Sequence, residues 1–288
     1  MKALPCISVI TPVYNAEKTI EDCIKSLLNQ DYPKTRYEVI VVDNNSVDNS
    51  ERIINSYPVQ FIKCVEKGSY VARNMGARNA KGEILAFTDS DCVASKDWLK
   101  VIASSFSQNN LVAVQGPGNI TLQKNLKVKV ECFVRKMTEN NFWGDTKNLA
   151  VRKDVFNEAG GFKDFFTGCD TLFLNTLILK KYNVKFNKNM VVFHTFPTNL
   201  VSLIKKNWKH GLGDVFRAAK MRRLNRKDKL KQMLYTHFRY SLKMLFLEGS
   251  FSEKVCMCLY YVIMRQVRSL SYVINSFSRK IRLVRKED

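Results

Sequence analysis

The chain has 288 residues, of which 45% are hydrophobic and 25% charged, a composition typical of a globular protein with one large domain; it excludes a disulfide-stapled mini-protein and a disordered chain. Its formal net charge is +21, and most of it lies near the C-terminus: residues 201–288 hold 21 Lys and Arg against 6 Asp and Glu, a net of +15, which leaves +6 for residues 1–200. So basic a region favours nucleic acid, an anionic membrane surface or an anionic substrate as its partner.

Short apolar runs and helical patterns alternate along the N-terminal half of the chain. Strands are expected at residues 7–11, 37–42, 60–65 and 83–88, and helices at residues 16–29, 47–57 and 70–80. Because strands that are joined by helices pair in parallel, this alternation predicts an α/β protein with a mainly parallel central sheet and helices on both faces.

The second half is less regular and becomes helical toward its end. We expect a strand at 111–115, a helix at 125–141 and a strand at 191–194. Beyond Pro197, apolar residues from Leu230 to Leu245 share one face of a basic helix. The uncharged residues 255–264 fall short of the roughly 18 that a membrane span needs. These patterns predict a domain of residues 1–200, with halves 1–115 and 116–200, and a basic amphipathic helical region, 201–288.

The N-terminus and the cysteines bear on the compartment. Residues 1–6 contain no signal-peptide run. The eight cysteines include no C-x-x-C pair, which argues against a structural zinc site or a disulfide framework. We therefore expect a cytoplasmic protein with free thiols.

Polar side chains follow the first, second and fourth predicted strands. The first strand ends in Thr11-Pro12-Val13-Tyr14-Asn15, the second in Asp43, and the fourth in Asp89-Ser90-Asp91. In an open α/β sheet, ligands bind at this edge, beyond the carboxyl ends of the strands. Two carboxylates at i and i+2 suit Mg²⁺ or Mn²⁺, which prefer oxygen ligands, although an isolated Asp-x-Asp is more often a solvated turn.

Four motifs in this order resemble family 2 of the inverting glycosyltransferases, which have the Rossmann-like GT-A fold. They are SVITPVYN at 8–15, SLLNQ at 26–30, EVIVVDNNSVDNS at 38–50, and ARNMG at 72–76 followed by GEILAFTDSD at 82–91. The resemblance implies a hexosyltransferase of class EC 2.4 that uses a UDP- or GDP-linked sugar. It would glycosylate a glycan or lipid-linked acceptor in the synthesis of cell-surface polysaccharide or glycoconjugate.

The resemblance also implies the donor site, position by position. It places eight residues on the nucleotide sugar: Thr11, Pro12, Tyr14, Asn15, Asp43, Arg73, Asp89 and Ser90. Asp43 would accept a hydrogen bond from the base, with a helix N-cap as the alternative. Arg73 would approach the diphosphate, or lie on the surface. Asp91, with His194 as a further ligand, would hold Mn²⁺ or Mg²⁺; a structural histidine is the alternative.

The acceptor side of the same family is resembled by residues 148–153, 159–162 and 168–173. Asp170 falls at the family's Gly-Glu-Asp motif, which implies a general base that deprotonates the acceptor hydroxyl; a helix N-cap is the alternative. Trp143 and Asn148 are weaker candidates for acceptor contacts. The chain departs from the family at Cys169, where an acidic residue is usual, and at Lys147, where glycine is common.

Two other classes of protein compete with an active transferase. A nucleic-acid-binding protein with a Rossmann-like core would require neither Asp91 nor Asp170, and an inactive homologue would have lost them. The aromatic residues of the basic region lie at helical spacing with Leu and Met, which favours attachment to the cytoplasmic face of an anionic membrane over nucleic acid. A helical subdomain that packs on the core or on another subunit is the alternative.

Overall fold

A computed structural model describes residues 4–107, 110–118, 121, 125, 127–130, 145–163, 168–196, 199–208, 211 and 250–276. The chain forms two compact units. Unit 1 comprises residues 1–122, 139–165 and 169–195, and unit 2 comprises residues 123–138, 166–168 and 196–288. Most of the predicted helix at 125–141 and the apolar face from Leu230 to Leu245 lie outside the described residues.

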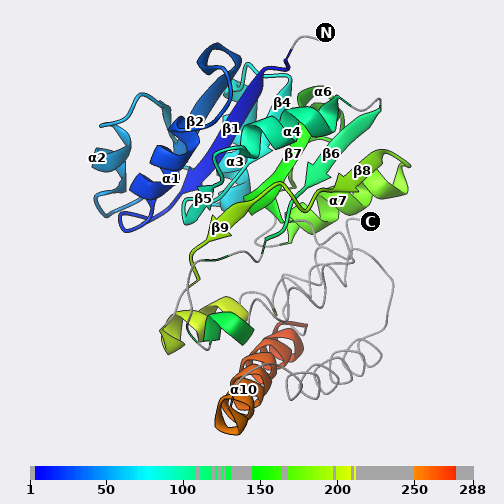
Figure 1. The fold of residues 1–288 in the computed structure, drawn as a ribbon. Helices are drawn as coiled ribbons and strands as arrows, with labels where there is room; N and C mark the ends of the chain where they lie inside the picture. The colour runs from blue at the N-terminus through cyan, green and yellow to red at the C-terminus, as the bar shows by residue number, and fades with distance from the viewer. Residues whose placement is uncertain are drawn as a thin grey trace. The chain divides into compact units, whose positions relative to one another are not determined.

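Unit 1 is built on a seven-stranded sheet with the strand order β3-β2-β1-β4-β7-β6-β8 (Figure 1). The strands are β1 (Ile7–Val13), β2 (Tyr37–Asp43), β3 (Gln60–Lys63), β4 (Ile84–Phe87), β6 (Leu111–Gln115), β7 (Leu149–Arg152) and β8 (Asn183–Phe186). All neighbours pair in parallel except β7, which runs antiparallel to β4 and β6. The predicted α/β fold with a mainly parallel sheet is confirmed.

Helices cover both faces of the sheet, and each face has its own apolar core. One core contains residues of α1 (Ile20–Leu28), α2 (Ser50–Ile54) and α4 (Trp98–Phe106). The other contains residues of α3 (Ser69–Asn79), α6 (Lys153–Glu158) and α7 (Cys169–Leu179). Alternate side chains of a strand point to opposite faces, so Val9 of β1 joins the first core and Ile10 the second.

Helix α3 approaches the sheet closely because Gly76 has no side chain. A Cβ atom at this position would lie 2.5 Å from Cγ2 of Ile10 and 3.2 Å from Cγ2 of Val42. Arg73 lies three residues earlier, on the same helical face as Gly76 and nearer the carboxyl ends of β1 and β4. The close packing of α3 on the sheet therefore brings Arg73 near the strand ends at the polar edge.

A second, two-stranded sheet adjoins the end of β4. Its strands, β5 (Cys92–Ala94) and β9 (Val192–His194), are antiparallel, with Cys92 opposite His194. The ladder continues one residue further, because the Thr195 amide donates to the Asp91 carbonyl at 2.9 Å. This pairing brings His194 beside the Asp-x-Asp turn.

Several elements differ from expectation at their boundaries. The strand at 111–115 is confirmed, but α2 covers only five residues of the helix expected at 47–57. The Asp48 carboxylate accepts hydrogen bonds from the amides of Ser50 and Glu17, each at 3.0 Å, and so stabilises a turn before the helix. Strand β7 was not predicted, because its four residues carry no periodic pattern of their own.

In unit 2, the longest described helix is α10 (Phe251–Ser276). Ser271 on this helix donates a hydrogen bond to the Trp208 carbonyl at 2.6 Å. None of the described helices combines the length and the apolar character needed to cross a bilayer.

Candidate active site

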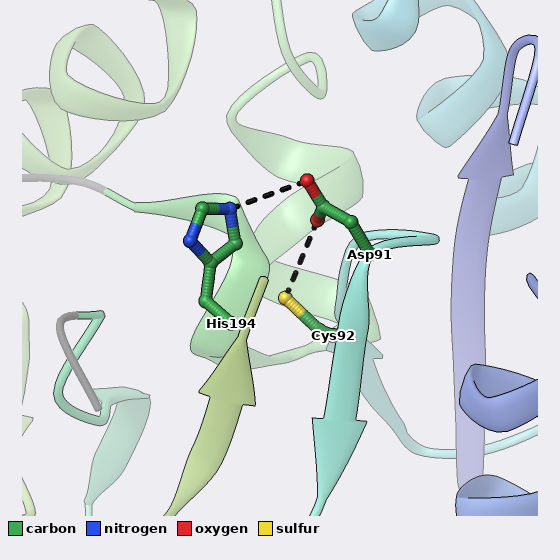
Figure 2. A group of neighbouring side chains, drawn as sticks. All are labelled: Asp91, Cys92 and His194. Atoms are coloured by element: carbon green, nitrogen blue, oxygen red, sulfur yellow. Dashed lines mark hydrogen bonds and ion pairs between the residues drawn. The ribbon is translucent and has the colours of Figure 1, made fainter. Parts of the chain in front are cut away.

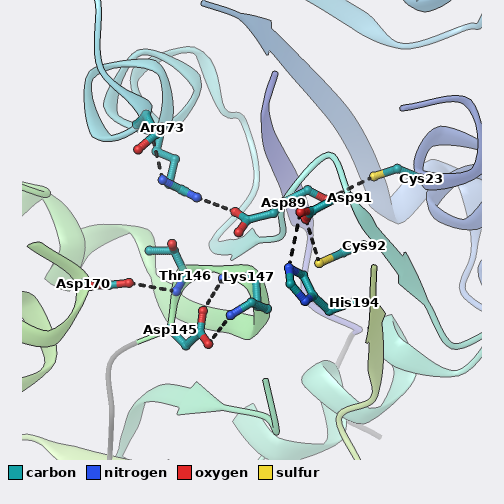
Figure 3. Close-up of polar contacts among 11 residues, drawn as sticks. Cys23, Arg73, Asp89, Asp91, Cys92, Asp145, Thr146, Lys147, Asp170 and His194 are labelled. Carbon is teal, nitrogen blue, oxygen red and sulfur yellow. Dashed lines mark hydrogen bonds and ion pairs between the residues drawn. The ribbon is translucent and has the colours of Figure 1, made fainter. Parts of the chain in front are cut away.

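The polar residues that follow β4 lie beside Arg73 of α3 (Figure 3). The Arg73 guanidinium is buried, forms an ion pair with Asp89, donates to the Ser69 carbonyl at 3.2 Å and lies 5.4 Å from the ring centroid of Tyr70. Burial opposes the charged form of Arg73, but Asp89 and Tyr70 outweigh it, so the pKa of Arg73 is raised. The surface-arginine alternative is wrong: Arg73 is a fixed cation at the sheet edge.

Asp91 and His194 form a second polar pair at this edge (Figure 2). The His194 Nε2 and Asp91 Oδ2 atoms are 3.3 Å apart, and the Cys92 thiol donates to Asp91 Oδ1 at 3.7 Å. One ligand atom from each of the three residues lies within 4.8 Å of the others. Ser90 lies half-buried in the turn between the two aspartates.

The chemistry of this donor set fits a divalent cation. Adjacent ligands of a cation bound at about 2.1 Å lie about 3 Å apart, close to the separation of the Asp91 and His194 atoms. Carboxylate oxygen and imidazole nitrogen are both ligands of Mn²⁺, whereas the Cys92 thiol is a softer donor. Burial would raise the pKa of Asp91, but the hydrogen bond from His194 and the charges of His194 and Lys147 hold it below its ordinary value. Asp91 is therefore a carboxylate at neutral pH, as a metal ligand must be.

The residues predicted to hold the nucleobase lie at the ends of β1 and β2. Asp43 is fully buried; its Oδ2 atom accepts from the Ser46 amide at 3.2 Å, and its Oδ1 atom has no hydrogen-bond partner in the part of the chain that is described. Since α2 begins only at Ser50, the N-cap alternative for Asp43 is wrong. A buried carboxylate oxygen with free acceptor capacity suits the N–H groups of a base.

The other donor-side residues surround this carboxylate. Thr11 and Pro12 are buried in β1, where they pair with β2, whereas Tyr14 is largely exposed. Asn15 adopts a φ of 49°, and its side-chain oxygen accepts from the Val47 amide at 2.8 Å. Asn15 thus joins the loops that follow the two strands. Contacts of these four residues with a nucleotide stay predictions.

Asp170 lies in the first turn of α7. Its Oδ1 atom accepts from the Thr171 amide at 2.8 Å, and its Oδ2 atom accepts from the Thr146 amide at 3.4 Å. Burial raises the pKa of Tyr70 well above its ordinary value, and the Asp170 carboxylate that its hydroxyl contacts adds to the shift. Tyr70 therefore links Asp170 to Arg73, over whose guanidinium its ring lies. The helix begins at Cys169, so Asp170 is its second residue rather than its cap.

Asn148 has a structural role in the described part of the chain. Its amide group donates to the carbonyls of Pro117 at 3.0 Å and Met190 at 2.7 Å, and accepts from the Trp98 indole at 2.9 Å. These bonds connect the turn before β7 to α4, to the segment after β6 and to the segment before β9. A contact of Asn148 with the acceptor stays a prediction. Trp143 lies outside the described residues.

Two residues near Asp91 and His194 were not assigned to the site from the sequence. Cys92 directly follows Asp91, and Lys147 is buried in the turn η2 (Thr146–Asn148) that precedes β7. The only sequence signals were the adjacency of Cys92 to the Asp-x-Asp motif and the replacement of a common glycine by Lys147.

The fold and this edge define a GT-A protein of the nucleotide-sugar transferase class. The family model of Glycosyl transferase family 2 matches residues 8–168, and the chain belongs to this family. It is accordingly a nucleotide-sugar glycosyltransferase of class EC 2.4, as predicted.

Known relatives agree with this assignment. The chain is 30% identical to Glycosyltransferase AglE of Haloferax volcanii over 225 residues, 74% of each protein. It is 37% identical over 109 residues to the poly(ribitol-phosphate) beta-N-acetylglucosaminyltransferase TarS of Staphylococcus aureus, but that match spans only 19% of TarS.

Solved structures share the fold. The mannosyltransferase PcManGT from Pyrobaculum calidifontis, in complex with GDP-Man and Mn²⁺, has a TM-score of 0.68 at 20% identity, over 96% of this chain and 89% of that one. S. aureus TarS 1–349 with UDP-GlcNAc has a TM-score of 0.53 at 17% identity, over 98% and 92%.

Proposed function

We propose that this protein catalyses the metal-dependent transfer of a sugar, with inversion, from a nucleotide-diphosphate donor to a hydroxyl of a glycan or lipid-linked acceptor. The observation that carries the proposal is the placement of Asp91 Oδ2 3.3 Å from His194 Nε2, at the same sheet edge as the Arg73–Asp89 pair and Asp170. This edge combines a candidate cation site, a fixed positive charge and a candidate base, which glycosyl transfer requires.

On the donor side, each residue has a distinct task. Asp43 accepts from the base N–H groups through its Oδ1 atom, and the exposed ring of Tyr14 lies against the base. Asp89, fixed by Arg73, accepts from the ribose hydroxyls. Asp91 and His194 would hold Mn²⁺ or Mg²⁺, which supplies positive charge to the departing diphosphate.

On the acceptor side, Asp170 removes the proton. As the acceptor oxygen attacks C1 of the sugar from the face opposite the leaving group, the oxygen–carbon bond forms, the bond from C1 to the phosphate oxygen breaks, and the hydroxyl proton passes to Asp170. Attack from the opposite face inverts the anomeric configuration. The amides of Thr146 and Thr171 fix the carboxylate in position while this occurs.

The relatives support the choice of donor and acceptor. The solved complexes of PcManGT and TarS contain GDP-Man and UDP-GlcNAc, and the name of TarS specifies a poly(ribitol-phosphate) acceptor. We infer that this chain uses a UDP- or GDP-linked hexose in the synthesis of a cell-surface polysaccharide or glycoconjugate.

Helix α10 supports attachment to the cytoplasmic face of a membrane. Every exposed side chain described on this helix is uncharged: Phe251, Ser252, Val255, Cys256, Leu259, Val262, Ile263, Gln266, Leu270, Val273 and Ile274. At 100° per residue these positions share one face, whereas Lys254, Arg265 and Arg268 lie away from it. Since residues 201–288 carry a net +15, they repel a second copy and are attracted to anionic lipid. An in-plane helix of this kind would hold the enzyme near a lipid-linked acceptor.

The function is tested by hydrolysis of a panel of UDP- and GDP-sugars, with Mn²⁺ and with EDTA. We expect one donor to be hydrolysed only with metal, and Asp91→Asn and Asp170→Asn to reduce the rate of hydrolysis at least 100-fold, since water then takes the place of the acceptor hydroxyl. Asp154→Asn removes a carboxylate that is paired with Arg152 on the surface and serves as the matched control. Full activity in EDTA would contradict the metal site, and an active Asp170→Asn variant would contradict the base.

Membrane attachment is tested by co-sedimentation of the full chain with vesicles that contain phosphatidylserine. We expect the wild type to sediment, and Leu259→Ser/Ile263→Ser to remain in the supernatant. Neutralising Arg222, Arg223, Arg226 and Lys227 would weaken binding in a salt-dependent manner. The exposed Leu179 of unit 1 provides the control variant Leu179→Ser. Unchanged sedimentation of the double variant would exclude α10 as the binding face.

A further inference from the structure

A buried lysine lies at the polar sheet edge without a role in the function proposed above. The Lys147 side chain is 8% exposed and forms an ion pair with Asp145, which is 19% exposed. Lysine is almost never this buried unless it is paired, because burial penalises its charge. Among the described residues, its ion-pair partner is Asp145, two residues earlier in the chain, so this buried pair forms within one short segment.

Strand register places Lys147 next to the Asp-x-Asp motif. Strand β7 pairs antiparallel with β4, with Phe87 opposite Leu149. The ladder ends at this pair, with Asp89 two residues after Phe87 and Lys147 two residues before Leu149, so both leave the ladder at the same end. In the view of Figure 3 the lysine lies below the two aspartates and is joined to Asp145. The charge of Lys147 also helps to lower the pKa of Asp91, as expected for a cation close to that carboxylate.

The charges at this edge identify which cation is available to a ligand. Arg73 is held by Asp89 and by the Ser69 carbonyl, and His194 is a metal-ligand candidate. Lys147 is different because the flexible side chain can turn from Asp145 to another anion. Asp145 is the more exposed member of this pair, so water can solvate its carboxylate when the lysine turns away. A nucleoside diphosphate adds at least two negative charges at this edge. If Lys147 turned from Asp145 to the diphosphate, the lysine would neutralise the diphosphate and water would solvate the Asp145 carboxylate.

We propose that Lys147 binds the donor diphosphate directly, as a resident cation that Asp145 holds in place until the donor arrives. The proposal rests on the function proposed above and extends it. Because the cation belongs to the chain, part of the diphosphate affinity is present before any divalent ion binds. Lys147 also remains to neutralise the diphosphate as it leaves the sugar.

The proposal is tested by calorimetric titration of the full chain with UDP and with GDP, in EDTA and in saturating Mn²⁺. We expect the wild type to bind one nucleotide in EDTA, Lys147→Met to bind it at least 10-fold more weakly, and Lys147→Arg to recover part of the loss. The corresponding nucleoside, which lacks phosphate, should bind wild type and Lys147→Met equally. The exposed Lys100, paired with Asp31, provides the control variant Lys100→Met.

Asp145→Asn separates ligand binding from a structural role of the ion pair. If Lys147 exchanges partners, Asp145→Asn removes the carboxylate that competes with the diphosphate for Lys147, and nucleoside diphosphate binding in EDTA becomes tighter. If the ion pair only supports the turn, Asp145→Asn weakens binding as Lys147→Met does. The second result overturns the proposal, as does equal diphosphate affinity of wild type and Lys147→Met, or a wild type that binds only with Mn²⁺. A wild type that binds neither nucleotide under either condition overturns the proposed function as well.

Discussion

The sheet edge of unit 1 and helix α10 of unit 2 expose different kinds of side chain. At the sheet edge of unit 1, three carboxylates reach the surface, each paired with a basic side chain: Asp89 with Arg73, Asp91 with His194 and Asp145 with Lys147. On α10 of unit 2, every exposed side chain described is uncharged, and most are aliphatic. Buried ion pairs require precise partners, whereas an apolar face requires only something to cover it. The first surface is suited to chemistry and the second to attachment.

The largest effect is expected from breaking the Arg73–Asp89 pair. Arg73→Met should lower the free energy of unfolding by about 3–5 kcal/mol, because it leaves a partly buried carboxylate without its cation. Arg152→Met is the control: Arg152 and Asp154 are 50% and 63% exposed, and losing such a pair costs at most about 1 kcal/mol. Urea denaturation measures both. Equal losses of unfolding free energy would show that the Arg73–Asp89 pair stabilises the protein no more than the surface pair Arg152–Asp154 does.

Matched isoleucine truncations compare the two units directly. Ile24 of α1 is fully buried, whereas Ile263 of α10 is 54% exposed. Ile24→Ala should destabilise the protein by about 2–5 kcal/mol through the cavity it leaves. Ile263→Ala should change stability by less than about 0.5 kcal/mol while it weakens vesicle binding. A large stability loss at Ile263 would mean that another part of the chain already covers this face.

Asn148→Ala tests the side-chain hydrogen bonds that hold η2 to three neighbouring segments. It removes two donors and an acceptor from buried partners and should cost about 1–3 kcal/mol. Asn79 donates a similar amide bond to the Met75 carbonyl on the surface, so Asn79→Ala should cost far less. Thermal unfolding of the two variants would distinguish them, and similar midpoints would contradict a bridging role.

The smallest effect concerns acid stability at the surface. The hydrogen bond from Arg152 holds the pKa of Asp154 below its ordinary value of 3.8. A depressed pKa contributes stability above that value, and the contribution is lost as pH falls through the folded-state pKa. Wild type should therefore lose up to about 0.5 kcal/mol more than Asp154→Asn between pH 5 and pH 2, since the pair is exposed. Parallel urea titrations across that range would measure the difference.

The central strands could be predicted from sequence because they are buried on both faces. The apolar runs of β1, β2 and β6 leave little alternative, whereas the residues of β7 become a strand only when β4 and β6 supply partners on either side. Helix α2 is shorter than its pattern because the side chain of Asp48 caps a turn, a local competition that periodicity does not reveal.

The residues of the candidate site also differ in how far the sequence predicts them. Asp91 and His194 were assigned through the family resemblance, and the β5–β9 ladder brings them together. The proximity of Lys147 to this motif depends on the register between β4 and β7, and no local feature of residues 145–148 encodes that register. The side chains that belong to family motifs could thus be assigned from the sequence, whereas Lys147, which precedes the antiparallel strand β7 and replaces a common glycine, could not.

The reversed direction of β7 also affects how the family can diversify. The chain between Pro117 and Asp145 connects two strands that are already hydrogen-bonded neighbours, with Gln115 opposite Leu149. Lengthening a connection between fixed ends costs little, about 0.6 kcal/mol for each doubling of a flexible loop. We therefore expect insertions and deletions among homologues to accumulate at the ends of this connection, next to Gly118 and Asp145, rather than at the buried Val128 and Val130. New acceptors could then be acquired during evolution while the nucleotide-binding strands keep their sequence.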